Sequence, residues 1–154
     1  MAWAGDRGFC SNLDLKEAAA MSGALAEEGV KGEKLFRRKN DFSRTIDLMR
    51  ACHQPVIAAV NGAAIGGGLS FALAADVRLA SHDARFCASY INIGLGGADM
   101  GSNYLLWRIV GWGRAVELLL TGRVIDCDEA YRMGLVNHVY NREDLLNGHW
   151  RWRQ

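Results

Sequence analysis

The chain has 154 residues, a length that fits one domain and argues against two. Its 18 basic and 17 acidic side chains give a formal net charge of +1, so we expect neither a nucleic-acid-binding protein nor one that binds an anionic membrane surface. Half of the residues are hydrophobic, which is enough for a core, and no apolar run reaches the roughly 18 residues of a membrane helix, so no membrane span is expected.

The first half of the chain predicts two helices, a strand and the start of a third helix. Residues 14–28 are rich in helix formers, and residues 33–52 place apolar side chains at helical intervals between charges. Residues 55–62 form a short apolar, β-branched run that ends in Asn-Gly, which is typical of a buried strand. A glycine-dense stretch follows, with a helix expected from about Gly67.

The second half alternates between strand and helix patterns. Strands are expected over residues 76–81, 84–89 and 135–140, helices over residues 102–111, 113–122 and 126–134, and a glycine-rich loop over residues 93–101. The residues after 140 open like a helix and end in tryptophan and arginine. Strands that alternate with helices predict an α/β architecture with mostly parallel pairing.

The cysteines and histidines give no sign of a metal site. The four cysteines stand at wide spacings without a CxxC pair, and the histidines show no HxxxH spacing, so we expect no metal. The start of the chain has no basic segment followed by an apolar one, so no secretory signal is recognised. The protein is therefore expected inside the cell, with the thiols reduced and packed as small core residues.

Three consecutive glycines, Gly66 to Gly68, follow a predicted strand and open a predicted helix. Backbone without Cβ atoms can approach a ligand closely, and the free N–H groups of a helix start favour an anion such as a phosphate or a thioester enolate. The surrounding residues match neither GxGxxG nor a P-loop, which argues against phosphate. Alternatively, the glycines only permit close packing of the helix on a strand.

Four ordered segments carry a resemblance to a known family. They are RGFCSNLDLK, QPVIAAVNGAAIGGGLSFALAADVRLAS, the stretch from ARFCAS to IVG, and LTGRVIDCDEAYRMGLV. In this order they resemble the crotonase family of enoyl-CoA hydratases and isomerases, from about Arg7 to Tyr140. The resemblance implies a spiral of ββα turns that binds an acyl-CoA thioester. It implies no separate cofactor, because coenzyme A is part of the substrate.

The same resemblance implies an oxyanion hole of two backbone N–H groups, which stabilises a thioester enolate. One donor falls on Leu13 and the other on Gly67, with Gly66 and Gly68 beside it in the pocket. The preceding Asn12 stands where the family usually has glycine. Because asparagine tolerates a left-handed backbone better than other residues with a side chain, the turn is expected to survive with some strain.

Hydratases of this family use two glutamates, and those positions correspond here to Ser70 and Tyr90. A serine without a partner base takes no proton near neutral pH, and a tyrosine with an ordinary pKa of about 10 is a poor base. Hydration by two glutamates is therefore not expected, and both side chains are interpreted as pocket walls.

Asp99, in GGADMG, is the carboxylate that remains in this region. Its spacing before MGSNYLLWRIVG resembles that of the aspartate of dienoyl-CoA isomerases, which shuttles a proton along the acyl chain, although the approach to it is one residue longer. We expect Asp99 to be the catalytic base of an isomerase that acts on unsaturated, dienoyl thioesters. Alternatively, Asp99 caps the following helix, and the two roles can coexist.

Family members usually have two strands and a helix before the RGFC segment and several helices after the last matched strand. We therefore expect a crotonase-like fold that is shortened at both ends, with a partial core domain over residues 1–140 and a divergent tail over residues 141–154. The resemblance implies a homo-oligomer, in the family a trimer, located in the cytoplasm or, in a eukaryote, in mitochondria or peroxisomes. The alternative function is a non-catalytic remnant that associates with partner subunits.

Overall fold

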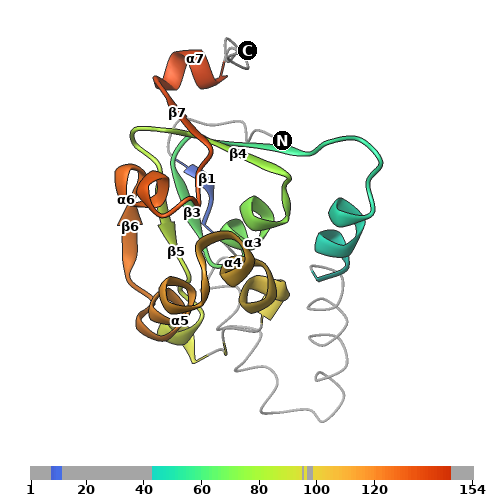
Figure 1. The fold of residues 1–154 in the computed structure, drawn as a ribbon, viewed down its shortest axis with the longest axis vertical. Helices are drawn as coiled ribbons and strands as arrows, with labels where there is room; N and C mark the ends of the chain where they lie inside the picture. Colours follow the sequence, from blue (N-terminus) through green and yellow to red (C-terminus); the bar gives the residue numbers. More distant parts are fainter. Residues whose placement is uncertain (1–7, 12–42, 95, 97–98, 147–154) are drawn as a thin grey trace, which may run out of the picture.

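Two β-sheets organise the part of the chain that the computed structural model describes, which is residues 8–11, 43–94, 96 and 99–146 (Figure 1). The first sheet has the strand order β1-β3-β5-β6, with β1 at Gly8–Cys10, β3 at Ala63–Ile65, β5 at Arg85–Cys87 and β6 at Val124–Asp126. The second has the order β2-β4-β7, with β2 at Ile57–Val60, β4 at Val77–Ser81 and β7 at His138–Tyr140. From β2 to β5 the chain alternates between the two sheets.

Pairing within the sheets is mostly parallel, as the alternation of strand and helix patterns predicts. β1 pairs with β3 in parallel, with Gly8 opposite Ala63, and β2, β4 and β7 are likewise parallel to their neighbours. The exception is β6, which runs antiparallel to β5. The α/β class with mostly parallel pairing, expected from the sequence, is therefore correct.

The helices lie close to their expected ranges. They are α3 (Gly67–Ala74), α4 (Ser102–Val110), α5 (Trp112–Thr121), α6 (Cys127–Arg132), α7 (Arg142–Leu146) and an unlabelled helix over residues 43–50. The helix expected over residues 14–28 and the first part of that over residues 33–52 lie outside the described residues. Two short 3₁₀ turns, η1 (Ile91–Ile93) and η2 (Asp99–Gly101), flank the glycine-rich loop.

Three strands depart from the sequence interpretation. Ala63–Ile65 forms β3 where only a glycine-dense connection was expected, Val124–Asp126 forms β6 between two predicted helices, and Gly8–Cys10 forms β1. Each has three residues, too few by itself to show a period of two, and none lies within a longer run that the sequence analysis interpreted as a strand. The Asn-Gly after β2 connects two strands of different sheets, β2 and β3, so it does not form a hairpin turn.

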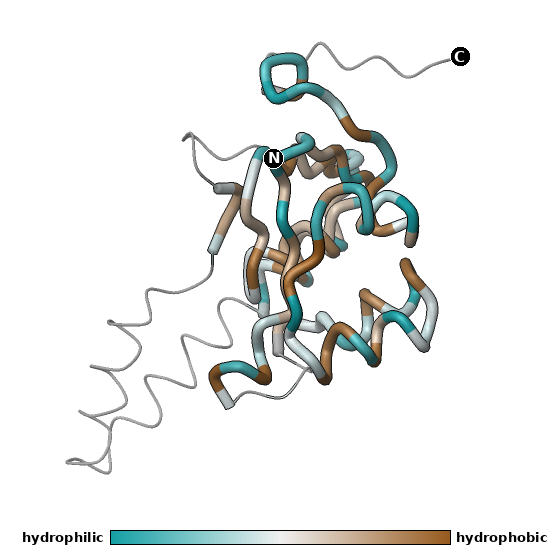
Figure 2. The backbone as a smooth tube through the Cα atoms, turned by 90° about the vertical axis from the view of Figure 1, so that its left-hand side faces the viewer, coloured by the Kyte–Doolittle hydropathy of each residue, from teal (hydrophilic) through white to brown (hydrophobic). Residues whose placement is uncertain are grey.

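The main core lies between the sheets and the helices. Leu69 and Leu73 of α3, Phe86 of β5, Leu106 of α4 and Ile125 of β6 are all buried in one apolar cluster. Several helical turns in Figure 2 carry both hydrophobic and hydrophilic residues, as expected of helices with one buried face, whereas almost every residue of α3 is buried. A smaller cluster joins Leu145 of α7 to the second sheet.

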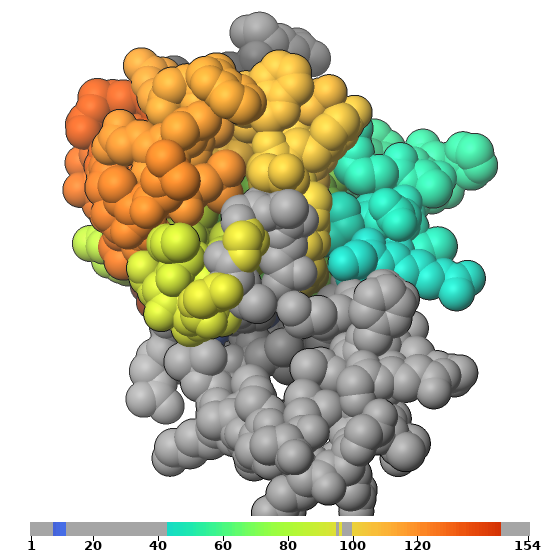
Figure 3. Space-filling model, turned by 90° about the horizontal axis from the view of Figure 1, so that it is seen from below, coloured from blue at the N-terminus to red at the C-terminus, as the bar shows by residue number. Residues whose placement is uncertain are grey.

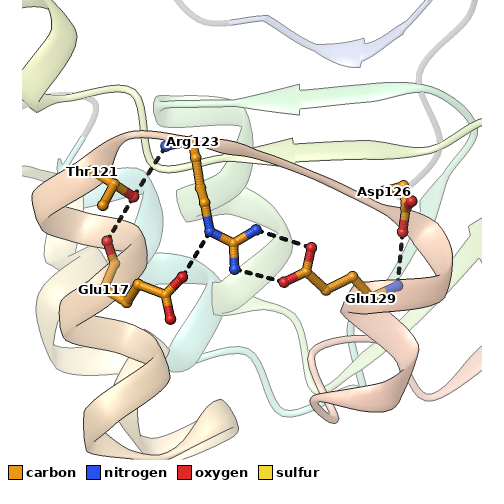
Figure 4. Close-up of polar contacts among 5 residues, drawn as sticks. All are labelled: Glu117, Thr121, Arg123, Asp126 and Glu129. Atoms are coloured by element: carbon orange, nitrogen blue, oxygen red, sulfur yellow. Dashed lines mark hydrogen bonds and ion pairs between the residues drawn. The ribbon is translucent and has the colours of Figure 1, made fainter.

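A network of charged side chains ties α5 to α6 across β6 (Figure 4). The Arg123 guanidinium donates from Nε to Glu117 at 2.8 Å and from its two terminal nitrogens to both carboxylate oxygens of Glu129, at 2.6 and 2.9 Å. Asp126 caps α6 by accepting the Glu129 N–H at 2.8 Å. The hydrogen bonds from Arg123 hold the pKa of Glu129 below its usual value. The two-pronged contact therefore links the residue after α5 to α6 in a defined orientation.

The described thiols are free but differ in their surroundings. Cys87 and Cys127 are buried core residues, as expected, whereas Cys10 is half-buried and Cys52 is exposed. The expectation that all four thiols pack in the core is therefore wrong for Cys52, which lies beyond the end of the helix over residues 43–50. Burial raises the pKa of Cys87, and burial together with the nearby charges of α6 raises that of Cys127 to about 11.

Two features are absent from the described residues. No helix there is long and apolar enough to cross a membrane. No group of three or more histidine, cysteine, aspartate or glutamate side chains is placed to hold a metal ion within the same residues.

The thiols generate a first prediction. With iodoacetamide at pH 8, Cys52 should be alkylated readily in the native protein, whereas Cys127 should react at least about 100-fold more slowly than an ordinary thiol, because its thiolate fraction falls about tenfold for each unit by which its pKa is raised. Peptide mapping by mass spectrometry measures both rates, with the guanidinium-unfolded chain as the control. Equal rates at Cys52 and Cys127 in the native protein would contradict the burial described above.

Candidate functional site

The turn from β3 into α3 forms the centre of the candidate site. Gly66 precedes the helix with φ 53° and ψ −117°, a conformation that favours glycine. Its N–H donates to the Cys87 carbonyl of β5 at 2.9 Å, and its carbonyl accepts the Ser70 N–H at 3.0 Å as the first hydrogen bond of the helix. The helix therefore begins at Gly67, as the sequence predicts, with the N–H groups of its first turn facing back towards the strand ends.

Gly68 shows why a second glycine is needed here. A Cβ atom at this position would lie 1.9 Å from the Cys10 carbonyl oxygen and 2.7 Å from its carbonyl carbon. These are backbone atoms of β1, so a side chain fits only if the helix and the strand move apart. Gly68 thus permits close packing of the helix on a strand, which was the alternative use of the glycine run in the sequence analysis. Gly67 is the first residue of the helix.

The packing of Gly68 also brings the end of β1 against the first turn of α3. The backbone of Cys10 touches the first turn of α3, and Leu13 follows Cys10 by three residues along the chain. Leu13 and Asn12 themselves lie outside the described residues, so the predicted donor at Leu13 stays a prediction.

Ser70 and Tyr90, the two residues at the hydratase glutamate positions, meet inside the protein. Their hydroxyl oxygens lie 2.5 Å apart, and Tyr90 also donates its hydroxyl proton to the Gly66 carbonyl at 2.7 Å. Both side chains are buried, at 0% and 1% exposure. The sequence predicted each of them as a pocket-wall residue but gave no sign that they bond to each other or to the glycine turn.

Asp99 lies at the start of η2, directly before α4. The backbone of η2 contacts α3, so this turn lies next to the helix that begins at Gly67. Its middle residue, Met100, has φ 49°, a left-handed conformation that is uncommon for a residue with a side chain, and Gly101 caps α4 with φ 69°. Two successive left-handed residues turn the chain sharply between Asp99 and α4.

Beside the site, the surface carries apolar side chains. Tyr90 leads into η1, whose Asn92 donates its amide to the Gly122 carbonyl at the end of α5, at 3.0 Å. The exposed apolar residues that flank these two positions are Ile91, Ile93, Leu120 and Val124. In the view from below, yellow-green residues around η1 lie beside orange residues of the α5–α6 region (Figure 3).

Comparison with known proteins gives three consistent findings. A family model described as enoyl-CoA hydratase/isomerase matches residues 3–154. A probable enoyl-CoA hydratase of Mycobacterium bovis is 45% identical over 141 residues, which are 92% of this chain and 49% of that protein. A peroxisomal Δ(3,5)-Δ(2,4)-dienoyl-CoA isomerase of Arabidopsis thaliana is 36% identical over 144 residues, 91% of this chain and 51% of that protein.

The fold agrees with these sequence matches. The crystal structure of a probable enoyl-CoA hydratase/isomerase from Mycobacterium abscessus superposes with a TM-score of 0.79 at 43% identity, over 96% of this chain and 52% of that chain. The chain thus spans about half the length of the curated relatives it matches.

Gly68 generates a second prediction. Gly68→Ala should lower the free energy of unfolding by about 3 kcal/mol, because the added methyl group forces α3 away from β1. The matched control is Gly113→Ala in α5, where an added Cβ meets nothing within 4 Å and should raise stability by about 0.5–1 kcal/mol through helix propensity. Urea unfolding measures both variants; the same sign of change in the two would contradict the packing argument.

Proposed function

The chain belongs to the enoyl-CoA hydratase/isomerase family, and from this premise we propose that it binds an acyl-CoA thioester and isomerises the double bonds of an unsaturated, dienoyl acyl group. The observation that carries the proposal is the Ser70–Tyr90–Gly66 hydrogen-bond chain, which puts two neutral hydroxyls where a hydratase of this family has carboxylates. Coenzyme A enters as part of the substrate, and no separate cofactor is proposed.

The start of α3 supports a role in binding the thioester oxygen. An enolate oxygen placed at Gly67 would accept a backbone N–H at the positive end of the helix dipole, where developing negative charge is stabilised. The second N–H of the proposed oxyanion hole is that of Leu13. Donors of this kind are worth about 3 kcal/mol each in the transition state, because they are already in place when the charge develops.

The buried hydroxyl pair supports isomerisation over hydration. Addition of water needs a base that takes a proton from water and an acid that protonates the neighbouring carbon. Tyr90 already donates its proton to the Gly66 carbonyl, and Ser70 bonds to Tyr90, so both groups are engaged in holding the turn. A double-bond shift needs no water; a single base can take a proton at one carbon and return it at another.

Asp99 is the proposed base. Its turn lies against α3, close in the fold to the proposed oxyanion donor. In the proposed reaction its carboxylate removes a proton from the carbon next to the thioester. The electrons move into an extended enolate held at Gly67 and Leu13, and the same carboxyl group returns the proton farther along the chain. The number of protons is conserved, and no oxidant is consumed.

A second candidate, a non-catalytic chain that associates with other subunits, is favoured by one observation. Trp112 is 71% exposed and Leu120 69% exposed, and both large apolar side chains of α5 would be shielded from water by association with another subunit. Sedimentation with and without an added dienoyl thioester, run beside the activity assay, separates the two candidates. Self-association without any turnover would favour the non-catalytic role.

The third prediction concerns the type of reaction. The protein should convert a 3,5-dienoyl-CoA to its 2,4 isomer, followed by the rise in absorbance of the conjugated thioester, and should leave crotonyl-CoA unhydrated on the same time scale. The matched variant combines Ser70→Glu with Tyr90→Glu, which places a carboxylate at both positions where a hydratase of this family has a glutamate. Brisk hydration of crotonyl-CoA by the unaltered protein would contradict the proposal.

The fourth prediction concerns Asp99. Asp99→Asn keeps the size of the side chain but removes its charge, so dienoyl turnover should fall by about 10²–10⁴-fold. Thermal stability should change little, because the N-cap of α4 is Gly101 and not Asp99. The control is Asp126→Asn, the same exchange at the cap of α6, which should retain full turnover. If Asp99→Asn and the unaltered protein turn over the substrate at the same rate, the base is another residue.

A further inference from the structure

The direction of the hydrogen bonds in the Ser70–Tyr90–Gly66 chain follows from the groups themselves. The Gly66 carbonyl can only accept, so the 2.7 Å contact is donated by the Tyr90 hydroxyl. That hydroxyl has a single proton, so in the 2.5 Å contact the donor is Ser70 and the acceptor is Tyr90. Protons thus point in one direction, from Ser70 through Tyr90 to the carbonyl of the glycine turn.

The carbonyl of Gly66 and the N–H of Gly67 belong to the same peptide unit. In a planar trans peptide these two groups point in opposite directions, so a hydrogen bond that fixes the oxygen also fixes the direction of the N–H. We propose that Tyr90 is a positioning residue that aims the Gly67 N–H at the thioester oxygen, and that Ser70 acts through Tyr90. This inference rests on the proposed function and adds a role for both hydroxyls.

The glycine turn is a place where such a restraint is needed. Gly66 has φ 53° and ψ −117°, and a peptide between two glycines rotates more freely than one between residues with side chains. The Ser70 N–H bond to Gly66 is the ordinary first bond of the helix. The phenol supplies a second bond to the same oxygen, from a ring fixed in the core, and so limits rotation of the peptide plane.

The first test uses no substrate. In ¹⁵N-labelled protein, the residual dipolar coupling of the Gly67 N–H reports the direction of that bond. Tyr90→Phe, which keeps the ring and removes the hydroxyl, should change this coupling while the couplings of α5 stay within error. Ser70→Ala should shift it in the same direction by less, since Tyr90 still reaches Gly66. In a Tyr90→Phe background, Ser70→Ala should add nothing, because Ser70 acts through Tyr90.

The second test uses the carbonyl stretch of a bound, non-reacting acyl-CoA thioester, measured by difference infrared spectroscopy. Hydrogen bonding to the carbonyl lowers its frequency, so Tyr90→Phe should move the band back towards its value in water. Turnover of dienoyl-CoA should fall by about 10- to 100-fold with KM changed by less than about threefold, since misdirection of a donor weakens mainly the transition state. Tyr131→Phe, at an exposed position on α6, is the control and should change neither quantity.

The outcomes separate the two proposals. A protein that binds no acyl-CoA thioester overturns the proposed function, while the Gly67 coupling still decides the positioning role. An unchanged Gly67 coupling in folded Tyr90→Phe overturns the positioning role, even where turnover is observed. If Tyr90→Phe does not fold, Ser70→Ala carries the test, and an unchanged Gly67 coupling in that variant overturns the inference.

Discussion

The contact between Gly68 and the end of β1 is the constraint on which the candidate site depends. Because an added Cβ would lie 1.9 Å from the Cys10 carbonyl oxygen, the first turn of α3 packs directly on the strand backbone. That contact fixes how close the first turn of α3 lies to the first sheet. Gly66, two residues before Gly68, makes a sharp turn out of β3. Its positive φ explains why this position is a glycine as well.

The interior next to this turn contains neutral polar groups. Ser70 and Tyr90 are almost completely buried, and a carboxylate at either position would lose its hydration on burial unless it were compensated. The two hydroxyls avoid that cost because each has a hydrogen-bond partner, and the chain of bonds ends on a carbonyl that can only accept. Arg78 is the contrasting case. Burial lowers its pKa, and its guanidinium is held by the carbonyls of Leu135 and Ala75.

The sequence predicted the larger elements and part of the site. The apolar run of β2 and the start of α3 at Gly67 were recognised because their patterns extend over enough residues to show a period or a helix signal. β3 and β6 were missed because one stands in a glycine-dense stretch and the other at the junction of two helical patterns, whereas the equally short β5 and β7 lie within longer strand-like runs. The bond between Ser70 and Tyr90 could not be predicted, because the two residues lie on different elements and no spacing rule relates them. Leu13 lies outside the described residues and remains untested.

The pairing of β1 has a consequence for folding. Residues 8–10 pair with residues 63–65, so this strand contributes contacts only after a long stretch of chain has been closed into a loop, which costs entropy. β2 to β5, in contrast, are neighbours in sequence and can assemble first. The turn at Gly66 would then form early, and β1, whose backbone packs against Gly68, would pair late. Detachment of β1 from β3 would remove the backbone against which Gly68 packs and would expose Phe9, which is buried in the main core, so loss of this short strand would disturb the start of α3 and the core together.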